Sequence, residues 1–472
     1  MLKTQNRDPE DNVWYRLATL FGRPFHFAID PDGDLPKSLP KAEEIIARNR
    51  KAWNRYMAAS LTEVERAEIL KEQPLLSEDD LTPYSAEDLN ILINDFSERS
   101  KSVKNAATLP DKPPYEINFS NLDFDSGFYV EGFIFVSHCN FHGSTFPDGH
   151  ATGAWFDNAT FGKTASFKNV TFACLSTTFN GTSFHTDADF ENATFSGAYF
   201  RGTVFARAAF FYRATVRFAH FERAVFRGAT NFMETRFFQG IFEKATFSGW
   251  VSFQDTIFSA HAHFKDSIFH SSISFVNAQM NGEASFEGTK FYSEPPRFHG
   301  AKIHEGSVWR GASWPLPKNV TEAGTFIDAY ERLKFEMDRL KKHEDELNFF
   351  AHELQSRRIY HGMFRGFPIA LYGLLSDYGR SYFRPLIWLL VIWVLGAVGL
   401  LTHFGLYHYP RAFGLSLVNT FGALGFRREF VDPSVTQKLS RALELVAGLQ
   451  SISGIILLFL FGLGVRNRFR MR

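Results

Sequence analysis

The sequence lacks most features of secreted, disulfide-stabilised and nucleic-acid-binding proteins. Its 472 residues include only two cysteines, Cys139 and Cys174, which excludes a disulfide framework and is typical of a reducing compartment. The 51 basic and 51 acidic side chains cancel, so no overall charge favours nucleic acid or acidic substrates. Asp8, Glu10 and Asp11 lie in an N-terminal stretch without an apolar run, so we expect no signal peptide and a cytoplasmic N-terminus.

Sequence motifs that carry chemistry are also missing. The chain has no phosphate-binding loop, dinucleotide fingerprint or nucleophile elbow, so we predict a non-enzymatic protein without a cofactor. The groups that offer metal ligands are His138 with Cys139 and His142, His261 with His263, and His343 beside Glu344. None of these groups supplies four ligands at a recognised metal-binding spacing, so we predict no metal site.

The chain is rich instead in phenylalanine at a fixed interval. Between Pro114 and Ile303 a phenylalanine returns every five or six residues. This interval fits neither the helical period of about 3.6 residues nor the alternation of a strand. Fixed self-similarity of this kind predicts a solenoid, in which each unit buries its apolar face by stacking on its neighbours. The phenylalanines that we assign to an inward-facing core ladder are Phe156, Phe161, Phe167, Phe172, Phe190, Phe195, Phe200, Phe232, Phe237, Phe242, Phe247, Phe253, Phe258, Phe264, Phe269, Phe286 and Phe291.

Small residues precede most of these phenylalanines by two positions, as Ala193 precedes Phe195. Large and small side chains would therefore alternate in a narrow interior. The segments Asn192–Ser196 and Lys244–Ser248 closely match the consensus of the pentapeptide-repeat family in its phenylalanine-centred form, which residues 115–305 resemble. This resemblance implies a mainly β fold, a right-handed quadrilateral β-helix solenoid with one pentapeptide on each side.

The resemblance also implies the size of the solenoid. One coil takes about twenty residues and coils stack at about 4.8 Å, which gives about nine coils and a rod of roughly 40–45 Å. From Phe247 onward the interval alternates between five and six residues, so Phe247, Phe258 and Phe269 recur at eleven. We expect the surplus residue to bulge at a corner, because a one-residue shift within a strand would turn the phenylalanine outward.

Residues 1–114 precede the repeat and predict a small helical region. Helices are expected over residues 39–57, 62–71 and 86–99, and residues 100–114 form a polar, proline-containing linker. One interpretation is a helical cap over the first coil, because the open end of a β-helix is an exposed strand edge. The alternative is an independent interaction domain.

Residues 320–384 follow the repeat and predict amphipathic linker helices. Phe326, Tyr330, Leu333 and Met337 recur at spacings of four and three, which places them on one helix face. The register continues past a charged break, which allows a helical hairpin. We expect this face to pack against the last coils, with a short intermolecular coiled coil as the alternative.

Two uncharged stretches, residues 385–407 and 446–465, are each long enough to cross the hydrocarbon core of a membrane. We therefore predict a helical membrane domain over residues 385–472 with two transmembrane helices. Arginines such as Arg384 and Arg466 lie before the first stretch and after the second. Because basic residues stay in the cytoplasm, we expect a multi-pass protein of the plasma (bacterial inner) membrane, with both termini and the β-helix in the cytoplasm.

Residues 411–426, between the two spans, are apolar but too short to cross. Two spans around such a re-entrant-like segment resemble the pore unit of potassium-type channels, and the candidate pore residues are Thr420, Gly422 and Gly425. The Thr-Val-Gly-Tyr-Gly selectivity filter of that family is absent, so the resemblance does not imply potassium selectivity. The alternative is a two-helix anchor with a partly buried loop.

The second span contains polar and small residues. Gln450 is more typical of a hydrogen bond to a neighbouring helix than of a conduction pathway. Ala447 and Ser451 lie four residues apart and form a small-residue face, which permits a homo-oligomer.

Arginines are frequent in the middle of the repeat and define a candidate patch for anionic partners. The patch consists of Arg201, Arg207, Arg213, Arg217, Arg223 and Arg227. Most follow an inward phenylalanine by one or two positions, so they would face solvent, and stacked coils would gather them; the alternative is an ordinary solvated face. Some pentapeptide-repeat proteins imitate DNA and bind a topoisomerase, which needs a dominant acidic surface. Residues 115–305 carry 18 acidic and 14 basic side chains, so we expect neither this mimicry nor a nucleic-acid partner.

Together these features predict a non-enzymatic membrane protein. A cytoplasmic β-helix, capped by N-terminal helices and tethered to the lipid bilayer by two C-terminal helices, would offer a rigid surface to an unidentified protein partner. The alternative is an oligomeric, ion channel-like protein with a degenerate pore whose gating the β-helix regulates.

Overall fold

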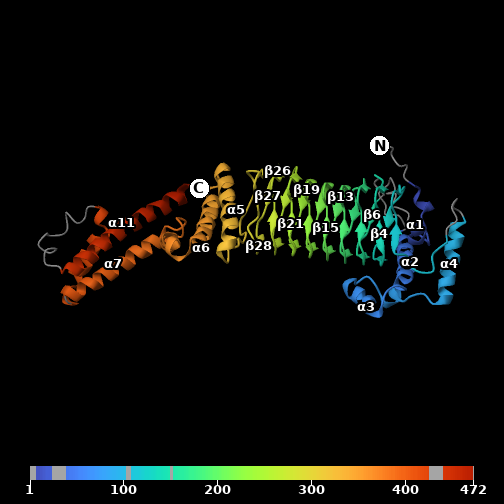
Figure 1. Cartoon of the computed structure of the whole chain (residues 1–472), viewed down its shortest axis with the longest axis horizontal. Coiled ribbons are helices and arrows are strands. Elements are labelled where there is room, and N and C mark those ends of the chain that lie inside the picture. Colours follow the sequence, from blue (N-terminus) through green and yellow to red (C-terminus); the bar gives the residue numbers. More distant parts are fainter. Residues whose placement is uncertain are drawn as a thin grey trace. The chain divides into compact units, whose positions relative to one another are not determined.

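The computed structural model describes residues 7–23, 39–101, 108–148, 153–404, 406–424 and 440–470. The chain divides into two compact units, Met1–Pro315 and Leu316–Arg472. The first unit contains N-terminal helices and a β-solenoid of about eight turns, and the second unit is helical (Figure 1). The predicted β-solenoid with helices before and after it is thereby confirmed.

Four ladders of parallel strands build the solenoid, and each turn of the chain passes through them in order (Figure 1). The first ladder contains β1 (Glu116–Asn118), β4 (His138–Asn140), β8 (Ala165–Ser166), β12 (Ala188–Asp189), β15 (Ala209–Phe210), β18 (Thr230–Asn231), β21 (Val251–Ser252) and β25 (Ile273–Ser274). The second contains β5 (Thr145–Phe146), β9 (Thr171–Phe172), β13 (Thr194–Tyr199), β16 (Thr215–His220), β19 (Arg236–Ile241), β22 (Ile257–Phe258) and β26 (Gln279–Met280). The third contains β2 (Phe128–Tyr129), β6 (Ala154–Trp155), β10 (Thr177–Thr178), the same β13, β16 and β19, then β23 (Ala262–His263) and β27 (Ala284–Ser285). The fourth contains β3 (Ile134–Phe135), β7 (Thr160–Phe161), β11 (Ser183–Phe184), β14 (Val204–Phe205), β17 (Val225–Phe226), β20 (Thr246–Phe247), β24 (Ile268–Phe269) and β28 (Lys290–Phe291).

The turns differ in length along the solenoid. In the fourth ladder, Phe226 pairs with Phe247, and the two preceding pairs of phenylalanines have the same sequence spacing. Phe247 then pairs with Phe269, so this turn is one residue longer. An early turn is longer still, because Phe135 pairs with Phe161. Eight strands stand in this ladder, so the prediction of nine coils was too high by about one, because it assumed shorter turns.

The surplus residue of the longer turns lies between strands. In β19, Phe237 and Gly240 belong to one continuous strand, whereas their partners in the next turn, Phe258 and Ala262, are one residue further apart. The longer connection divides that turn into β22 and β23, with residues 259–261 between them. Phe258 therefore keeps its inward position while the corner takes up the added residue.

The phenylalanine rings fill the interior of the solenoid. All of those assigned to the core ladder are at most 2% exposed. Rings of neighbouring turns stack with parallel planes, as Phe205 does on Phe226 with centroids 4.8 Å apart. Rings that follow the first and third ladders meet edge to face, as Phe200 meets Phe211 at 5.6 Å and 90°. Both arrangements are favourable for aromatic rings, so the backbone repeat and the ring packing stabilise each other.

Threonine replaces alanine at several small interior positions and still pairs its hydroxyl. The buried Thr203 hydroxyl donates to the carbonyl oxygen of Phe179, one turn earlier, at 2.6 Å. Thr256 donates in the same way to Phe232 at 2.7 Å. These hydrogen bonds link neighbouring turns and leave no hydroxyl unpaired at these two positions.

Two corners in each turn require a left-handed backbone. Asn192 (φ 56°) and Gly202 (φ 64°) occupy these corners in one turn, and both residue types tolerate positive φ. Arg213 (φ 57°) and Arg223 (φ 59°) occupy the same corners one turn later. The corner geometry therefore sets the position of two arginines of the predicted patch.

The N-terminal helices belong to the same unit as the solenoid. They are α1 (Val13–Ala18), α2 (Leu39–Ala58), α3 (Glu63–Glu72) and α4 (Ala86–Ser100), with short 3-10 helices η1 (Pro9–Asp11) and η2 (Glu78–Leu81). The last three α-helices begin and end within one residue of their predicted bounds, and α1 was not predicted.

Helix α2 covers a strand edge near the start of the solenoid. The Asn54 side chain donates to the Gly132 carbonyl and accepts from the Ile134 amide, both at 2.9 Å. Trp53 donates its indole N–H to the Ile134 carbonyl at 2.8 Å. Because β3 is the first strand of the fourth ladder, these side chains pair backbone groups that an open solenoid end would leave to water or to another chain.

The aromatic stack continues past residue 305, where the predicted repeat ends. Trp309 stacks on Phe286 with centroids 4.3 Å apart, and Trp314 stacks on Phe291 at 5.1 Å. Tryptophan thus takes the place of phenylalanine in the last positions of the stack, where a search for phenylalanine alone does not find it.

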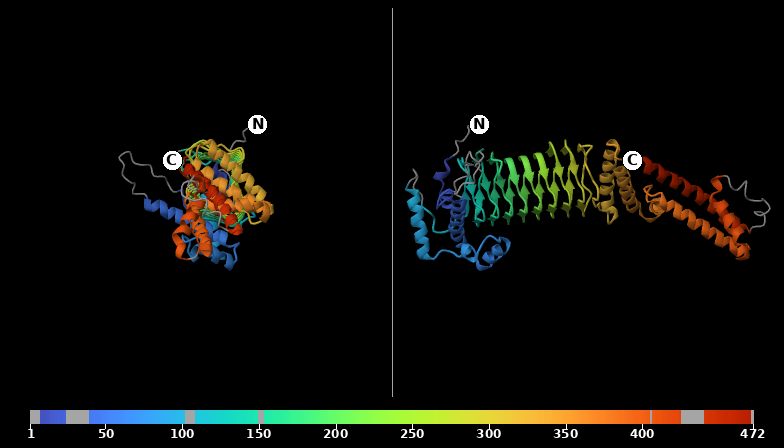
Figure 2. Two further views of the ribbon diagram at one scale, coloured as in Figure 1. Left: turned by 90° about the vertical axis from the view of Figure 1, so that its left-hand side faces the viewer. Right: turned by 180° about the vertical axis from the view of Figure 1, so that it is seen from behind.

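The second unit consists of helices. They are α5 (Val320–Arg339), α6 (His343–Ser376), α7 (Phe383–Phe404), η3 (Leu406–His408), α8 (Tyr409–Thr420), η4 (Gly422–Leu424) and α11 (Arg441–Arg470). α5 and α6 pack as a hairpin, in which Lys334 pairs with Glu353 at 2.5 Å. α7 and α11 lie side by side in the views of Figures 1 and 2.

The stack predicts how the solenoid responds to a buried charge. Phe195→Asp places an unpaired carboxylate among rings that cannot separate, and should destabilise the unit by several kcal/mol or unfold it. Phe238→Asp is the matched control, because Phe238 is 49% exposed in the same solenoid. Thermal melting of the full-length protein in detergent, followed by circular dichroism, measures both variants. An unchanged melting curve for Phe195→Asp would contradict the inward position of this ring.

Candidate functional site

Two helices in the described part of the chain are long and apolar enough to cross a membrane. The span Phe383–Thr402 of α7 has a mean hydropathy of 2.3, and that of α11 is 2.1. Their outward side chains are large and apolar, and Ile387, Leu395 and Phe459 are 59% to 69% exposed. Exposed apolar side chains on helices of this length are what a membrane span requires.

A cluster of polar side chains joins α7, α8 and α11. Gln450 of α11 is 6% exposed, and its amide nitrogen lies 2.7 Å from the Ser416 hydroxyl and 2.8 Å from the Thr420 hydroxyl of α8. The Ser416 hydroxyl donates to the Trp393 carbonyl of α7 at 2.6 Å. Three helices therefore meet at one hydrogen-bonded group, as the polar Gln450 in an apolar span had suggested.

The hydroxyl protons of this cluster fix the orientation of the Gln450 amide. Ser416 donates its proton to Trp393, and Thr420 donates to the Ser416 carbonyl at 2.9 Å. Both hydroxyl oxygens can then only accept, and the two hydrogens of the Gln450 amide match them. The cluster pairs its donors within the protein, which is what polar groups require in apolar surroundings.

Glycines allow the helices around the cluster to approach closely. A Cβ atom on Gly454 of α11 would lie 2.0 Å from the carbonyl oxygen of Thr420, and one on Gly396 of α7 would collide with the cluster itself. Gly448 and Gly462 of α11 have nothing within 4 Å of such an atom. α11 therefore has one packed side, toward α8, and one open side.

The predicted pore residues lie in helical backbone as far as the structure describes them. Thr420 is the last residue of α8, and its hydroxyl belongs to the cluster while its carbonyl packs on Gly454. Gly422 lies in the 3-10 helix η4. Gly425 lies outside the described residues. Residues 420–424 thus form no extended row of carbonyl groups of the kind that lines a selectivity filter.

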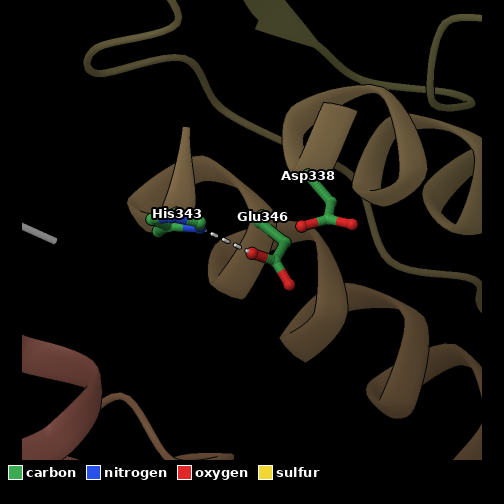
Figure 3. Close-up of side chains that lie close together, drawn as sticks. All are labelled: Asp338, His343 and Glu346. Atoms are coloured by element: carbon green, nitrogen blue, oxygen red, sulfur yellow. Dashed lines mark hydrogen bonds and ion pairs between the residues drawn. The ribbon is translucent and has the colours of Figure 1, made fainter. Parts of the chain in front are cut away.

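A second polar group lies at the turn between α5 and α6. Asp338, His343 and Glu346 have ligand atoms within 4.8 Å of one another, an arrangement that Figure 3 shows. His343 Nδ1 lies 3.1 Å from Glu346 Oε2. The guanidinium of Arg470, at the end of α11, lies 3.8 Å from a carboxylate oxygen of both Asp338 and Glu346. An arginine therefore already lies beside both carboxylates and ties the end of α11 to the hairpin.

His352 of α6 is largely buried in the hairpin. Its ring stacks on Tyr330 of α5 with centroids 5.2 Å apart, and its Nδ1 has no hydrogen-bond partner among the described residues. Burial, with the Arg380 guanidinium as a smaller cause, lowers the pKa of His352 from 6.5 to about 4. The imidazole is therefore neutral at pH 7.

The arginines of the predicted anionic-partner patch do not gather in one place, which corrects that prediction. Arg213 follows the first ladder, Arg217 lies in β16, Arg201 and Arg223 follow the third ladder, and Arg207 and Arg227 follow the fourth. Arg201 pairs with Glu222 at 3.3 Å, and Arg213 pairs with Glu234 at 2.7 Å. The prediction was wrong because an advance of five or six residues moves the chain to the next ladder, so nearby arginines point in different directions.

The cysteine and histidine group at residues 138–142 is divided between two sides of a strand. In β4, Cys139 points inward and is buried, whereas His138 and Asn140 lie on the outer side. Burial raises the pKa of the Cys139 thiol well above its usual value. Cys139 therefore cannot share a metal ion with His138. Within the described ranges, the only group of three or more adjacent ligands is the one at the α5–α6 turn.

Comparison with protein families identifies the type of solenoid. A family model described as pentapeptide repeats (9 copies) matches residues 221–268, and a second, described as pentapeptide repeats (8 copies), matches residues 186–210. Neither the curated proteins nor the solved structures gave a match. The two family matches confirm that this part of the chain consists of pentapeptide repeats, and neither of them concerns an ion channel.

The close contact at Gly454 predicts a sharp difference between glycines of one helix. Gly454→Ala forces α11 away from the Thr420 carbonyl, and we expect a loss of about 1–3 kcal/mol in the stability of the packed helices α7, α8 and α11. Gly448→Ala is the control, because its Cβ meets nothing and alanine favours a helix. Thermal unfolding in detergent compares the two. Equal melting temperatures would rule out this packing.

Burial of neutral His352 predicts that the stability of the α5–α6 hairpin depends on pH. The folded pKa of about 4 lies below the ordinary 6.5, so the folded state binds fewer protons than the unfolded state. Stability is then complete above pH 6.5 and falls as the pH drops toward 4, by up to about 3 kcal/mol. Hydrogen exchange of α5 and α6 peptides at each pH measures this loss of stability. His352→Phe should remove the difference, and an equal acid response in both proteins would exclude His352 as its source.

Proposed function

We propose that this chain is a membrane-anchored, non-enzymatic scaffold. α7 and α11 cross a lipid bilayer, and the pentapeptide-repeat solenoid offers a rigid surface to a protein partner. The observation that carries the proposal is the presence, in one chain, of a stacked solenoid and two apolar helices of membrane-spanning length. Arginines at the outer ends of these helices indicate which side of the bilayer the chain termini face.

The basic ends of the two helices lie together. Arg380 and Arg384 precede or begin α7, and Arg466 and Arg470 lie near the end of α11. Asn467 donates its side-chain amide to the Gly379 carbonyl at 3.0 Å, which joins these ends to each other. Basic residues remain in the cytoplasm, so both chain termini and the solenoid belong on the cytoplasmic side in this proposal.

The scaffold role rests on how the solenoid uses its residues. Most phenylalanines, together with the alanines and threonines of the small interior positions, are taken up by the internal stack, and most polar side chains remain outside at fixed spacings. Ion pairs such as Lys168–Glu191, at 2.6 Å, connect one turn to the next on this surface. A surface whose elements are fixed by both neighbouring turns costs little ordering entropy when a partner binds.

A second candidate function is an oligomeric pore regulated by the solenoid. The observation in its favour is α8, which packs against both α7 and α11 as a pore helix packs between two spans. The pairing of Thr420 and Gln450 within one chain favours the anchor instead, because these groups are not left for a shared conduction axis.

Cysteine accessibility in intact bacterial cells tests the proposed topology. The native cysteines are buried, so single introduced cysteines report alone. Tyr409→Cys, between the spans, should react with a membrane-impermeant maleimide added outside the inner membrane, and Phe469→Cys should react only after lysis. Both positions are exposed, so the control for labelling is the lysed sample. Equal reactivity of the two positions in intact cells would refute two membrane crossings.

Planar bilayer recordings separate the anchor from the pore. The anchor predicts no ion-selective current steps from the purified full-length protein. Reproducible selective steps that disappear when Gly422 and Gly425 are substituted would replace the anchor with the pore.

A further inference from the structure

The last part of α6 carries an apolar face that no described part of the chain covers. Gly362 has a non-helical backbone (φ 69°), so residues 363–376 form a separate helical segment, here called the α6 terminal segment. Its large apolar side chains Met363, Phe364, Phe367, Leu371 and Leu374 are 40% to 91% exposed.

These side chains occupy one side of the segment. At the helical period they fall within a sector of about 100°. The opposite side is packed, because a Cβ atom on Gly366 would lie 2.7 Å from the Arg358 carbonyl oxygen and one on Gly373 would lie 2.5 Å from the Tyr378 ring. One side of the segment therefore packs within its own unit, and the apolar side is free to contact another partner.

The free side continues into the surface of α7. Trp388 of α7 donates its indole N–H to the Leu374 carbonyl at 3.4 Å, and Arg384 donates to the Gly373 carbonyl at 3.1 Å. Phe383 and Ile387, in the first turns of α7, are also exposed. Tryptophan and arginine at the start of a span are typical of the boundary between lipid headgroups and acyl chains. The α6 terminal segment thus begins its contact with α7 at the level where a span enters the bilayer.

The charge around the segment matches an anionic surface. Arg358 and Arg365 are exposed, and neither pairs with an acidic group among the described residues. Asp377 is the only acidic residue from position 354 to 384, and it pairs with Arg380 at 3.0 Å. An apolar face bordered by basic residues is the pattern of a helix that lies in the membrane interface.

We propose that the α6 terminal segment is an interfacial membrane helix, whose apolar face lies among the upper acyl chains while Arg358 and Arg365 bind the phosphates of anionic lipids. The inference rests on the proposed insertion of α7 and names a third contact with the same bilayer. This contact fixes the level at which the chain enters the bilayer and the direction of the α5–α6 hairpin on its surface.

Site-directed spin labelling of the full-length protein in lipid vesicles tests the proposal. The labelled variants are Phe367→Cys in the segment, Asp328→Cys on the exposed side of α5, and Ile456→Cys on the exposed side of α11. Both native cysteines are buried, so labelling is selective. The measured quantity is the accessibility of the label to oxygen relative to a water-soluble nickel chelate. We expect a ratio at position 367 several-fold above that at 328 and below that at 456.

The outcomes distinguish this inference from the proposed function. A water-like ratio at 367 with a lipid-like ratio at 456 would overturn the interfacial helix and leave the two spans intact. Shielding of label 367 from both reagents would also overturn it, in favour of a second protein copy on this face. A water-like ratio at 456 would refute the membrane insertion itself.

Lipid composition tests the headgroup contact. In phosphatidylcholine vesicles that also contain phosphatidylglycerol, the ratio at 367 should rise above its value in phosphatidylcholine alone. Arg358→Gln combined with Arg365→Gln should abolish this rise and leave the ratio at 456 unchanged. A rise that persists in the double variant would exclude these two arginines as the anionic-lipid contact.

Discussion

The stacking of phenylalanine rings between turns is the constraint on which the first unit depends. Parallel strands stand about 4.8 Å apart, and Phe205 and Phe226 have the same centroid separation. Each turn must therefore bring its rings back to the ladder from which they started. Three features keep the rings in register from turn to turn. They are the small residues beside the rings, the buried threonine hydroxyls that donate to the previous turn, and the left-handed corners. Added residues fall at corners, where they leave the rings in place.

The repeat could be predicted from the sequence because its period is a local property of the chain. Its details depend on geometry that the period does not contain. The corners add residues without changing which side chains face inward, so the number of turns was overestimated. Trp309 and Trp314 stack on the last phenylalanine rings because their side chains are also flat and aromatic, and a search for phenylalanine alone does not find them. The arginine patch failed for a related reason: closeness in sequence places Arg207 and Arg213 beside different ladders.

The two apolar helices of membrane-spanning length were predictable for similar reasons, and their packing was not. Length and hydropathy locate α7 and α11, since both are properties of continuous segments. The polar cluster joins Gln450 to Ser416 and Thr420, which lie 34 and 30 positions earlier, so it emerges only when the helices are packed. The available signal was Gln450 in an apolar span, with Gly454 one helical turn further on. The contact of Arg470 with the α5–α6 turn has no counterpart in the sequence pattern.

The change in turn length after β19 restricts how the solenoid can lengthen by duplication of its repeats. Between Phe184 and this change, a duplicated segment as long as the step from Phe226 to Phe247 inserts one whole turn and returns every ring to its stack. After it, the copied segment must be one residue longer, as the step from Phe247 to Phe269 is. A copy whose extra or missing residue fell within a strand, and not at a corner, would turn the side chains of that strand to the wrong side. From Phe184 onward, the two lengths therefore divide the solenoid into two stretches, each of which expands most simply by copies of its own length, with the boundary at residues 259–261.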